Sequence, residues 1–98
     1  MQTLLAMVAQ NPTDSFARYG LAMEYAGTGE LEQAVGEFRA LLSTNPNYAA
    51  AYFHAGQALE KLGRLEQARL MYQEGIEMTT RLGDLHTRSE LQAALDLL

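Results

Sequence analysis

Few residues in this chain could support chemistry, and two histidines come first among them. His86 and Glu90 are four positions apart, which places both side chains on one face of a helix and could offer two ligands to a metal ion. A protein metal site of the zinc type needs at least three protein ligands, and no third ligand accompanies this pair. We therefore expect His54 and His86 to be structural or exposed, and we expect no metal and no cofactor.

Carboxylates and methionines are the other candidates for chemistry. Paired carboxylates could act as acid and base, but acids repeated along amphipathic segments are typical of a solvated helix face. The acids in question are Glu30, Glu32, Glu37, Glu66, Glu74 and Glu77. Met71 and Met78 fit flexible core side chains better than a cofactor site. No hydrolase triad motif and no phosphate-binding glycine motif occurs, so the sequence predicts a protein that is not an enzyme.

Size and charge narrow the class of protein further. A chain of 98 residues with 48% hydrophobic residues is enough for one globular domain. Its net charge of −5 argues against nucleic acid and against an anionic membrane surface as partners. It has no cysteine, so disulfides and thiol catalysis are excluded. No apolar run approaches the roughly 20 residues that cross a bilayer, and the first residues do not resemble a signal peptide, so we expect a cytoplasmic protein.

One six-residue phrase occurs twice in the chain. GELEQA begins at Gly29 and GRLEQA at Gly63, an offset of 63 − 29 = 34 residues. The same offset aligns the Asn-Pro pairs at 11–12 and 45–46. It also aligns Ala17 with Ala51, Tyr19 with Phe53, and Phe38 with Tyr72. A chance match would not extend to its flanks, so the chain contains a true internal repeat.

Each repeat predicts two helices. Residues 13–26 are apolar on several sides, with Asp14 or Thr13 as the helix cap, and the glycines at 27–29 end this helix. Residues 30–42 carry apolar side chains at the i, i+3, i+4, i+7 spacing of an amphipathic helix, which stops before Pro46. A helix pair of this length must stack on neighbours to bury its apolar faces. We expect Ala34 and Ala68 to be buried where the two helices of each pair cross.

The two ends of the chain complete the stack. Residues 1–10 predict a leading half-unit helix that packs through Leu4, Leu5 and Val8, and residues 84–98 predict a capping helix that begins at Asp84. The apolar stripe of this last helix is Leu91, Ala94, Leu95 and Leu98, and we expect it to cover some of Leu70, Ile76 and Met78. The single domain then comprises 1–10, repeat one at 11–44, repeat two at 45–80, and the cap at 84–98. Breaks are expected near 11–14, 27–30, 44–48, 62–64 and 82–84.

The period, the helix–turn–helix pattern and the residue types together resemble the tetratricopeptide repeat family, as found in small bacterial proteins. The matching residues are Leu21, Ala22, Tyr25, Gly29, Ala34, Phe38 and Pro46 in the first unit, and Tyr52, Ala55, Gly56, Leu59, Gly63, Ala68 and Tyr72 in the second. The resemblance implies an all-α fold: a right-handed α–α superhelix of helix pairs with a C-terminal capping helix.

Four residues depart from the family pattern. Arg18 stands where the family prefers tryptophan, Ala22 replaces a packing glycine, and Gly75 takes a position that is usually alanine. Thr80 replaces a terminal proline, which predicts that the second helix of unit two continues to about Leu82.

The resemblance also implies a concave groove lined by the first helix of each unit. The corresponding residues here are Phe16, Tyr19, Met23 and Ala26 in unit one and Ala50, Phe53, Gln57 and Glu60 in unit two. A well-known groove of the family clamps a C-terminal carboxylate with lysine and asparagine, but those places hold Tyr19, Met23, Phe53 and Gln57 here. We therefore do not expect binding of acidic chaperone tails. Rigid aromatic side chains are good anchors for a protein partner.

Two functions remain open at this point. One is an adaptor or scaffold that binds an extended or helical segment of another protein in the groove. The alternative is a structural unit that forms homo-oligomers, such as a homodimer, by burying the same aromatic patch, because two full repeats are fewer than the roughly three usually needed for stability. A further open point is whether the leading helix of the chain itself covers Phe16 and Tyr19.

Overall fold

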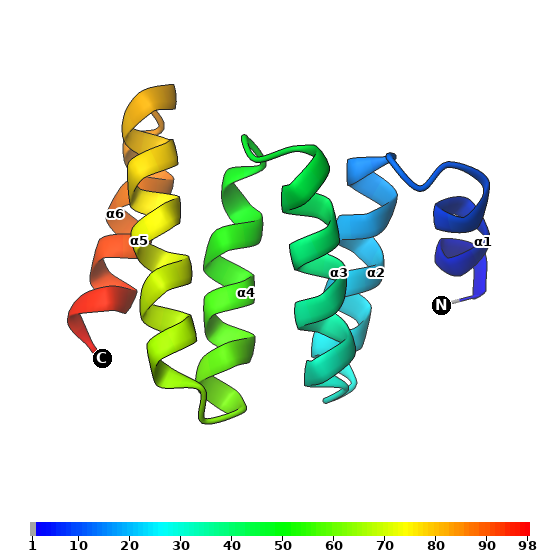
Figure 1. The fold of residues 1–98 in the computed structure, drawn as a ribbon, viewed down its shortest axis with the longest axis horizontal. Helices are drawn as coiled ribbons and strands as arrows, with labels where there is room; N and C mark the ends of the chain where they lie inside the picture. Colours follow the sequence, from blue (N-terminus) through cyan, green and yellow to red (C-terminus); the bar gives the residue numbers. More distant parts are fainter. Residues whose placement is uncertain (1) are drawn as a thin grey trace.

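A computed structural model describes residues 2–98, and these residues form six helices without a strand. The helices follow one another in a single array, so that neighbours in sequence lie side by side (Figure 1). The predicted breaks coincide with the gaps between these helices to within one residue. They are α1 (Gln2–Gln10), α2 (Ser15–Gly27), α3 (Leu31–Thr44), α4 (Ala49–Lys61), α5 (Leu65–Leu82) and α6 (Leu85–Asp96).

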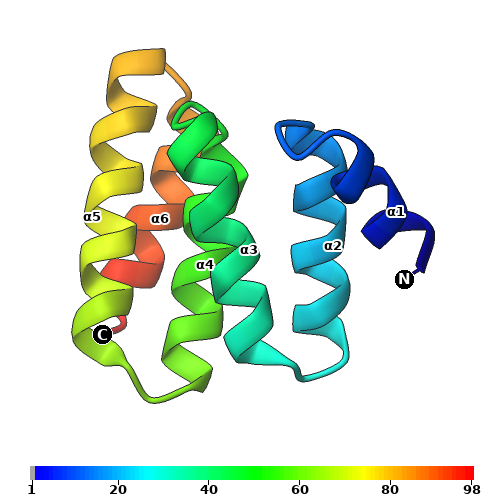
Figure 2. The same cartoon turned by 45° about the vertical axis from the view of Figure 1, so that its right-hand side comes forward.

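The helices pack as stacked hairpins. The pairs α2/α3 and α4/α5 are the most extensive contacts, α3 joins them by packing on α4, and α6 packs on both α5 and α4. Among the helices, α1 packs against α2 alone, at one end of the array (Figure 2). The first helices of successive units, α2, α4 and α6, therefore lie next to each other and form one continuous side of the molecule.

The repeated phrase marks the turn inside each helix pair. Gly29 and Gly63 adopt φ values of +82° and +77°, a left-handed conformation that side chains rarely tolerate. Aspartates cap the N-termini of two helices, as predicted. The side chain of Asp14 accepts a hydrogen bond from the amide of Ala17 at 3.1 Å, and that of Asp84 accepts one from the amide of Thr87 at 3.1 Å. Hydrogen bonds from Thr87 hold the pKa of Asp84 below its usual value. Because these glycines and aspartates act on their own turns and helix ends, the breaks between helices can be predicted from the sequence.

Small side chains allow the helices of each pair to approach closely. Ala34 and Ala68 are fully buried, as expected, and each lies on the second helix of its pair. The large buried side chains Phe38 and Tyr72 follow four residues later on the same faces. The two units thus use the same arrangement of a small and a large residue to build one continuous core.

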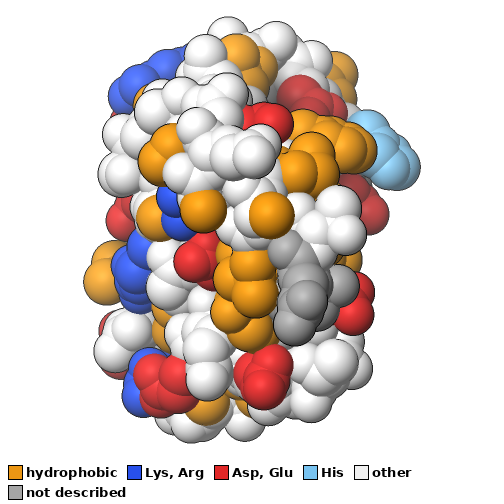
Figure 3. Space-filling view, turned by 90° about the vertical axis from the view of Figure 1, so that its right-hand side faces the viewer, with side chains coloured by type: hydrophobic (Ala, Val, Ile, Leu, Met, Phe, Trp, Pro, Cys, Tyr) orange, Lys and Arg blue, Asp and Glu red, His pale blue; other side chains and the backbone are white. Residues whose placement is uncertain are grey.

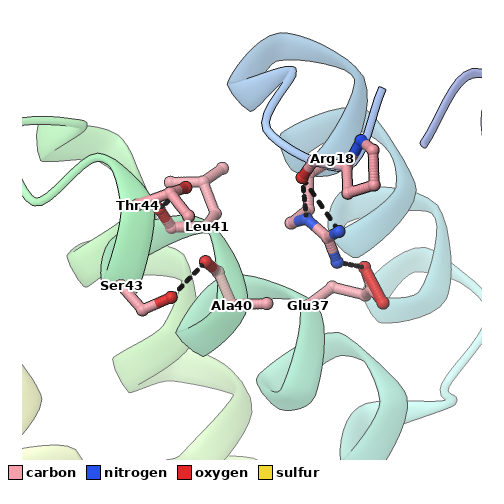
Figure 4. Close-up of polar contacts among 7 residues, drawn as sticks. Arg18, Glu37, Ala40, Leu41, Ser43 and Thr44 are labelled. Carbon is pink, nitrogen blue, oxygen red and sulfur yellow. Dashed lines mark hydrogen bonds and ion pairs between the residues drawn. The ribbon is translucent and has the colours of Figure 1, made fainter. Parts of the chain in front are cut away.

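Arg18 stands where the family prefers tryptophan. It makes polar contacts in place of the packing that a tryptophan side chain would make. Its Nη1 donates to Glu37 Oε2 at 2.8 Å, while its Nε and Nη2 donate to the carbonyl of Pro12 at 3.2 and 3.0 Å (Figure 4). The side chain therefore ties α2 to α3 and to the turn before α2. At the C-terminal end of α3, the hydroxyls of Ser43 and Thr44 donate hydrogen bonds to the carbonyls of Ala40 and Leu41 in the same helix (Figure 4).

Two apolar residues are less covered than the sequence suggested. Leu70 is 55% exposed, because it lies on a side of α5 that α6 does not cover. The α6 helix instead lies over Gly75, where an added Cβ would meet Leu91 Cδ1 at 2.9 Å. Leu5 is 43% exposed on α1, whereas Leu4 packs towards Gly20 of α2. The expectation was that α6 covers some of Leu70, Ile76 and Met78; Leu70 is exposed, whereas Ile76 and Met78 are half-buried against the core.

Candidate functional site

Two neighbouring hollows open on the side formed by α2, α4 and α6. The first has a volume of about 240 Å³ and lies between α2 and α4; the second has about 400 Å³ and lies between α4 and α6. Gln57 on α4 lines both, so the two hollows lie side by side along this helix. The first is lined by Met23, Ala26, Gly27, Leu31, His54, Gln57, Ala58 and Lys61, and the second by Phe53, Gln57, Glu60, Glu90, Ala93, Ala94 and Leu97.

The hollows bring together five of the eight residues expected in the groove, namely Met23, Ala26, Phe53, Gln57 and Glu60. Phe16 and Ala50 lie on the first turns of their helices and line neither hollow. Phe16 is 75% exposed, and Ala50 is half-buried. The hollows thus lie nearer the C-terminal ends of α2 and α4 than Phe16 and Ala50 do.

Tyr19 belongs to the packing between helices and lines neither hollow. Its ring centroid lies 5.0 Å from that of Tyr48, 6.0 Å from that of His54 and 6.2 Å from that of Phe38. Burial, with a smaller contribution from Tyr48, raises the pKa of Tyr19 above its usual value. The side chain therefore joins α2 to α3 and α4 as part of the fold.

The leading helix leaves both hollows open. No residue of α1 lines either of them, and α1 packs on α2 at the end of the array. Phe16 keeps most of its surface exposed. In the structure of residues 2–98, the N-terminal helix therefore does not cover this face. Coverage by that helix was one of the two alternatives.

His54 lies in the first hollow among aromatic rings. Its ring stacks on Phe38 at a centroid distance of 6.4 Å and meets Phe53 edge-on at 5.4 Å. Burial lowers the pKa of His54, and the negative charge of Glu90 opposes this shift only in part. Burial thus favours the neutral form of His54 on the wall of the first hollow. The sequence predicted a structural or exposed His54 and did not place it in the groove; the signal was its position three residues before Gln57, which puts both side chains on one face of the helix.

The second hollow depends on α6, which sequence reasoning treated only as a cap. Glu90, Ala93, Ala94 and Leu97 come from this helix. A signal was present in the spacing of the helices. α2 and α4 start 49 − 15 = 34 residues apart, and α6 starts 85 − 49 = 36 residues after α4. By this spacing α6 is the first helix of a third unit, which belongs on the same face as α2 and α4.

Two findings concern metal-ligand clusters and membrane-spanning helices among the described residues. Within 2–98, no three histidine or acidic side chains lie close enough together to hold a metal ion. His86 Nε2 and Glu90 Oε1 are 3.7 Å apart at the surface. No helix in this part of the chain has the length and apolar character required to cross a membrane.

The architecture and the spacing of its residues match a known family. A family model described as tetratricopeptide repeat matches residues 19–82. The chain belongs to the tetratricopeptide repeat family. The stacked helix pairs are accordingly the right-handed α–α superhelix of this family, with α6 as the capping helix, as predicted. Domains of this family generally mediate protein–protein interactions and are typically non-catalytic.

Several related proteins share both sequence and fold. A TPR repeat-containing protein of Pseudomonas aeruginosa is 25% identical over 95 residues, which is 97% of this chain and 90% of that protein. The crystal structure of a tetratricopeptide repeat domain protein from Salinibacter ruber is 36% identical, with a TM-score of 0.78 over 84% of this chain and 91% of that one. A solution structure from Bordetella parapertussis is 29% identical, with a TM-score of 0.84 over 97% and 83% of the two chains.

Proposed function

We propose that this tetratricopeptide protein is a non-catalytic binding module whose α2/α4/α6 face holds a segment of a partner protein. The observation that carries the proposal is the pair of neighbouring hollows that share Gln57, on a side of the molecule that residues 2–98 leave open. Together the hollows extend over three helices, a span that suits an extended peptide or a short helix better than a small molecule. The cytoplasmic location stays a prediction from the sequence.

Phe53 is the residue we expect to contribute most to affinity. It lines the second hollow and is half-buried between His54 and Tyr72, so its ring is held in place and still has surface to offer. Pre-ordered aromatic side chains near the centre of an interface are frequent hot spots, whose truncation typically costs about 2 kcal/mol or more. Met23 plays a similar part in the first hollow. Tyr19, expected to act alongside Phe53, is already engaged in packing, and its removal would weaken the fold first.

Self-association is the second candidate function, and the α1 end of the molecule favours it. Leu5, Met7 and Phe16 keep much of their surface exposed there. Hydrophobic side chains lie between charged ones on this end (Figure 3). Exposed apolar surface of this kind can serve as a contact between copies of a repeat protein.

A site-specific photo-crosslinker distinguishes these functions. A benzoylphenylalanine in place of exposed Gln57 samples the groove, and the same group in place of exposed Gln73 on α5 is the matched control. We expect Gln57-specific crosslinks to a discrete partner in a lysate of the source organism, and we expect Phe53→Ala to abolish them. A concentration-independent dimer in light scattering that Phe16→Ala disrupts, without Gln57-specific crosslinks to another protein, would establish the alternative. Equal crosslinking from both positions would refute the groove.

A further inference from the structure

The second hollow differs from the first in its charge. Its apolar lining residues are Phe53, Ala93, Ala94 and Leu97, and its charged lining residues are the two acids Glu60 and Glu90. The first hollow contains Lys61 as its charged residue and no acid. A ligand that fills the second hollow therefore meets both apolar surface and negative charge.

We propose that the second hollow binds a partner segment that presents a large apolar side chain with a lysine or arginine close to it. This inference rests on the proposed function and specifies the chemistry of the occupant. The apolar side chain covers Phe53 and Leu97, and the cation pairs with Glu60 and Glu90. The aliphatic stem of lysine or arginine can itself lie along an apolar floor while its charged end reaches a carboxylate.

Glu60 is held in position by a buried side chain from another helix. The hydroxyl of Tyr72 on α5 donates to Glu60 Oε2 on α4, and Tyr72 is fully buried. Burial and this hydrogen bond raise the pKa of Tyr72 above its usual value, so the hydroxyl stays protonated and remains a donor. Within residues 2–98, the hydrogen bond of the Glu60 carboxylate is made by Oε2, which leaves Oε1 as an acceptor for a ligand.

The support for Glu60 is specific to the second unit. At the 34-residue offset, Tyr72 corresponds to 72 − 34 = 38, a phenylalanine, and Glu60 to 60 − 34 = 26, an alanine. Phe38 has no hydroxyl and Ala26 has no carboxylate. The donor and the acid therefore occur together in the unit that borders the second hollow and are both missing from the first, as expected if the acid serves this hollow.

Glu90 supplies the second acid from α6. Its side chain is half-exposed, and its contact within the described residues is His86 Nε2 at 3.7 Å, on a side chain that is almost fully exposed. Its charge reaches the groove, since it raises the pKa of His54 against the effect of burial. The net charge of −5 adds a longer-range attraction for basic segments, which speeds association at low salt.

A displayed library of short random peptides, selected on the intact chain, tests the inference without a known partner. We expect the enriched peptides to contain a large apolar residue with lysine or arginine within one helical turn. Their binding should weaken as salt rises. The double variant Glu60→Gln/Glu90→Gln should bind them roughly three- to tenfold more weakly, the range expected for two partly exposed ion pairs. The amide oxygen that replaces the carboxylate at position 60 can still accept the Tyr72 hydroxyl, so the fold is retained.

The control is Glu66→Gln/Glu77→Gln, which changes the net charge equally at two exposed sites on α5 outside the hollow. It should bind as the unaltered chain does. If the double variant of the hollow is unstable, Glu90→Gln alone, which removes no packing, should still weaken binding. Enriched peptides that depend on Phe53 but lack a basic residue would overturn this inference and leave the proposed function intact. Peptides indifferent to Phe53→Ala, or no enriched peptides at all, would overturn both.

Discussion

The ring of Tyr72 lies directly over Gly56, so closely that a Cβ atom on Gly56 would overlap it. The two residues join α5 to α4, and Tyr72 is fully buried at this contact. In the first unit the corresponding pair is Phe38 and Ala22, at 72 − 34 and 56 − 34. The glycine of the second unit is therefore required by the close approach of the Tyr72 ring to α4.

Gly56→Ala should destabilise the protein by about 1–3 kcal/mol, because the added methyl group forces the buried Tyr72 ring to move. The melting midpoint should fall by several degrees, and the denaturant midpoint should fall with it. Gly36→Ala is the control. Gly36 is exposed within α3 and has open space around it, so alanine there should stabilise the helix by up to about 1 kcal/mol. If both variants raised the midpoint, the close contact would be absent in solution.

The ends of the helices were predictable, because the residues that set them act locally. Gly29 and Gly63 close turns through their own backbone conformation, and Asp14 and Asp84 cap helices through amides three residues away. The order and type of the helices follow from these signals and from the 34-residue offset. No knowledge of the distant parts of the chain is needed to see them.

The centre of the groove was predictable only in part, because it depends on contacts between distant residues. Met23, Phe53 and Gln57 face the hollows, as their positions on the first helices indicated. The engagement of Tyr19 depends on Tyr48 and His54, which are 29 and 35 positions later and meet it only when α4 stacks on α2. In the same way, the ion pair between Arg18 and Glu37 forms only when α3 packs against α2. The residues next to Arg18 in the sequence therefore do not explain why arginine stands at the family's tryptophan position.

Tyr72→Phe should reduce stability by about 1 kcal/mol at neutral pH, because the half-buried carboxylate of Glu60 loses the hydroxyl that donates to it. The loss should shrink above pH 10. Burial raises the pKa of Tyr72 in the folded state, so the unfolded chain releases this proton first and the tyrosine's stabilising contribution, full below pH 10, declines as pH rises. Urea unfolding of both proteins across alkaline pH measures the difference. A difference that stays constant with pH would show that the tyrosine titrates normally.

Ala68→Leu should cost about 1–3 kcal/mol, since Ala68 is fully buried where α5 crosses α4 and the larger side chain has no room. Gln73→Leu adds a leucine to the same helix at an exposed position and should change stability by less than about 0.5 kcal/mol. Paired thermal and urea unfolding experiments compare them. Equal effects from the two variants would mean that the crossing is looser than the structure indicates.

The capping helix should be required for the stability of the last pair, and Leu91 is the residue that tests this. It is the fully buried side chain of α6, and it lies against Gly75 of α5. Leu91→Ala should therefore cost about 2–5 kcal/mol, the usual range for truncating a buried leucine. Leu85→Ala is the matched control, because Leu85 begins the same helix and is 71% exposed. Its removal should change stability by less than about 0.5 kcal/mol.

Removal of residues 84–98 extends the same test from one side chain to the whole cap. The truncated chain should expose the apolar surface around Gly75 and the half-buried Ile76, and such surface promotes association. Light scattering and thermal unfolding of the intact and truncated chains measure both effects. The full chain should remain the more stable, and the truncated chain should form larger species as its concentration rises. A truncated chain that stayed monomeric and equally stable, with Leu91→Ala as mild as Leu85→Ala, would show that α6 rests on the stack without supporting it.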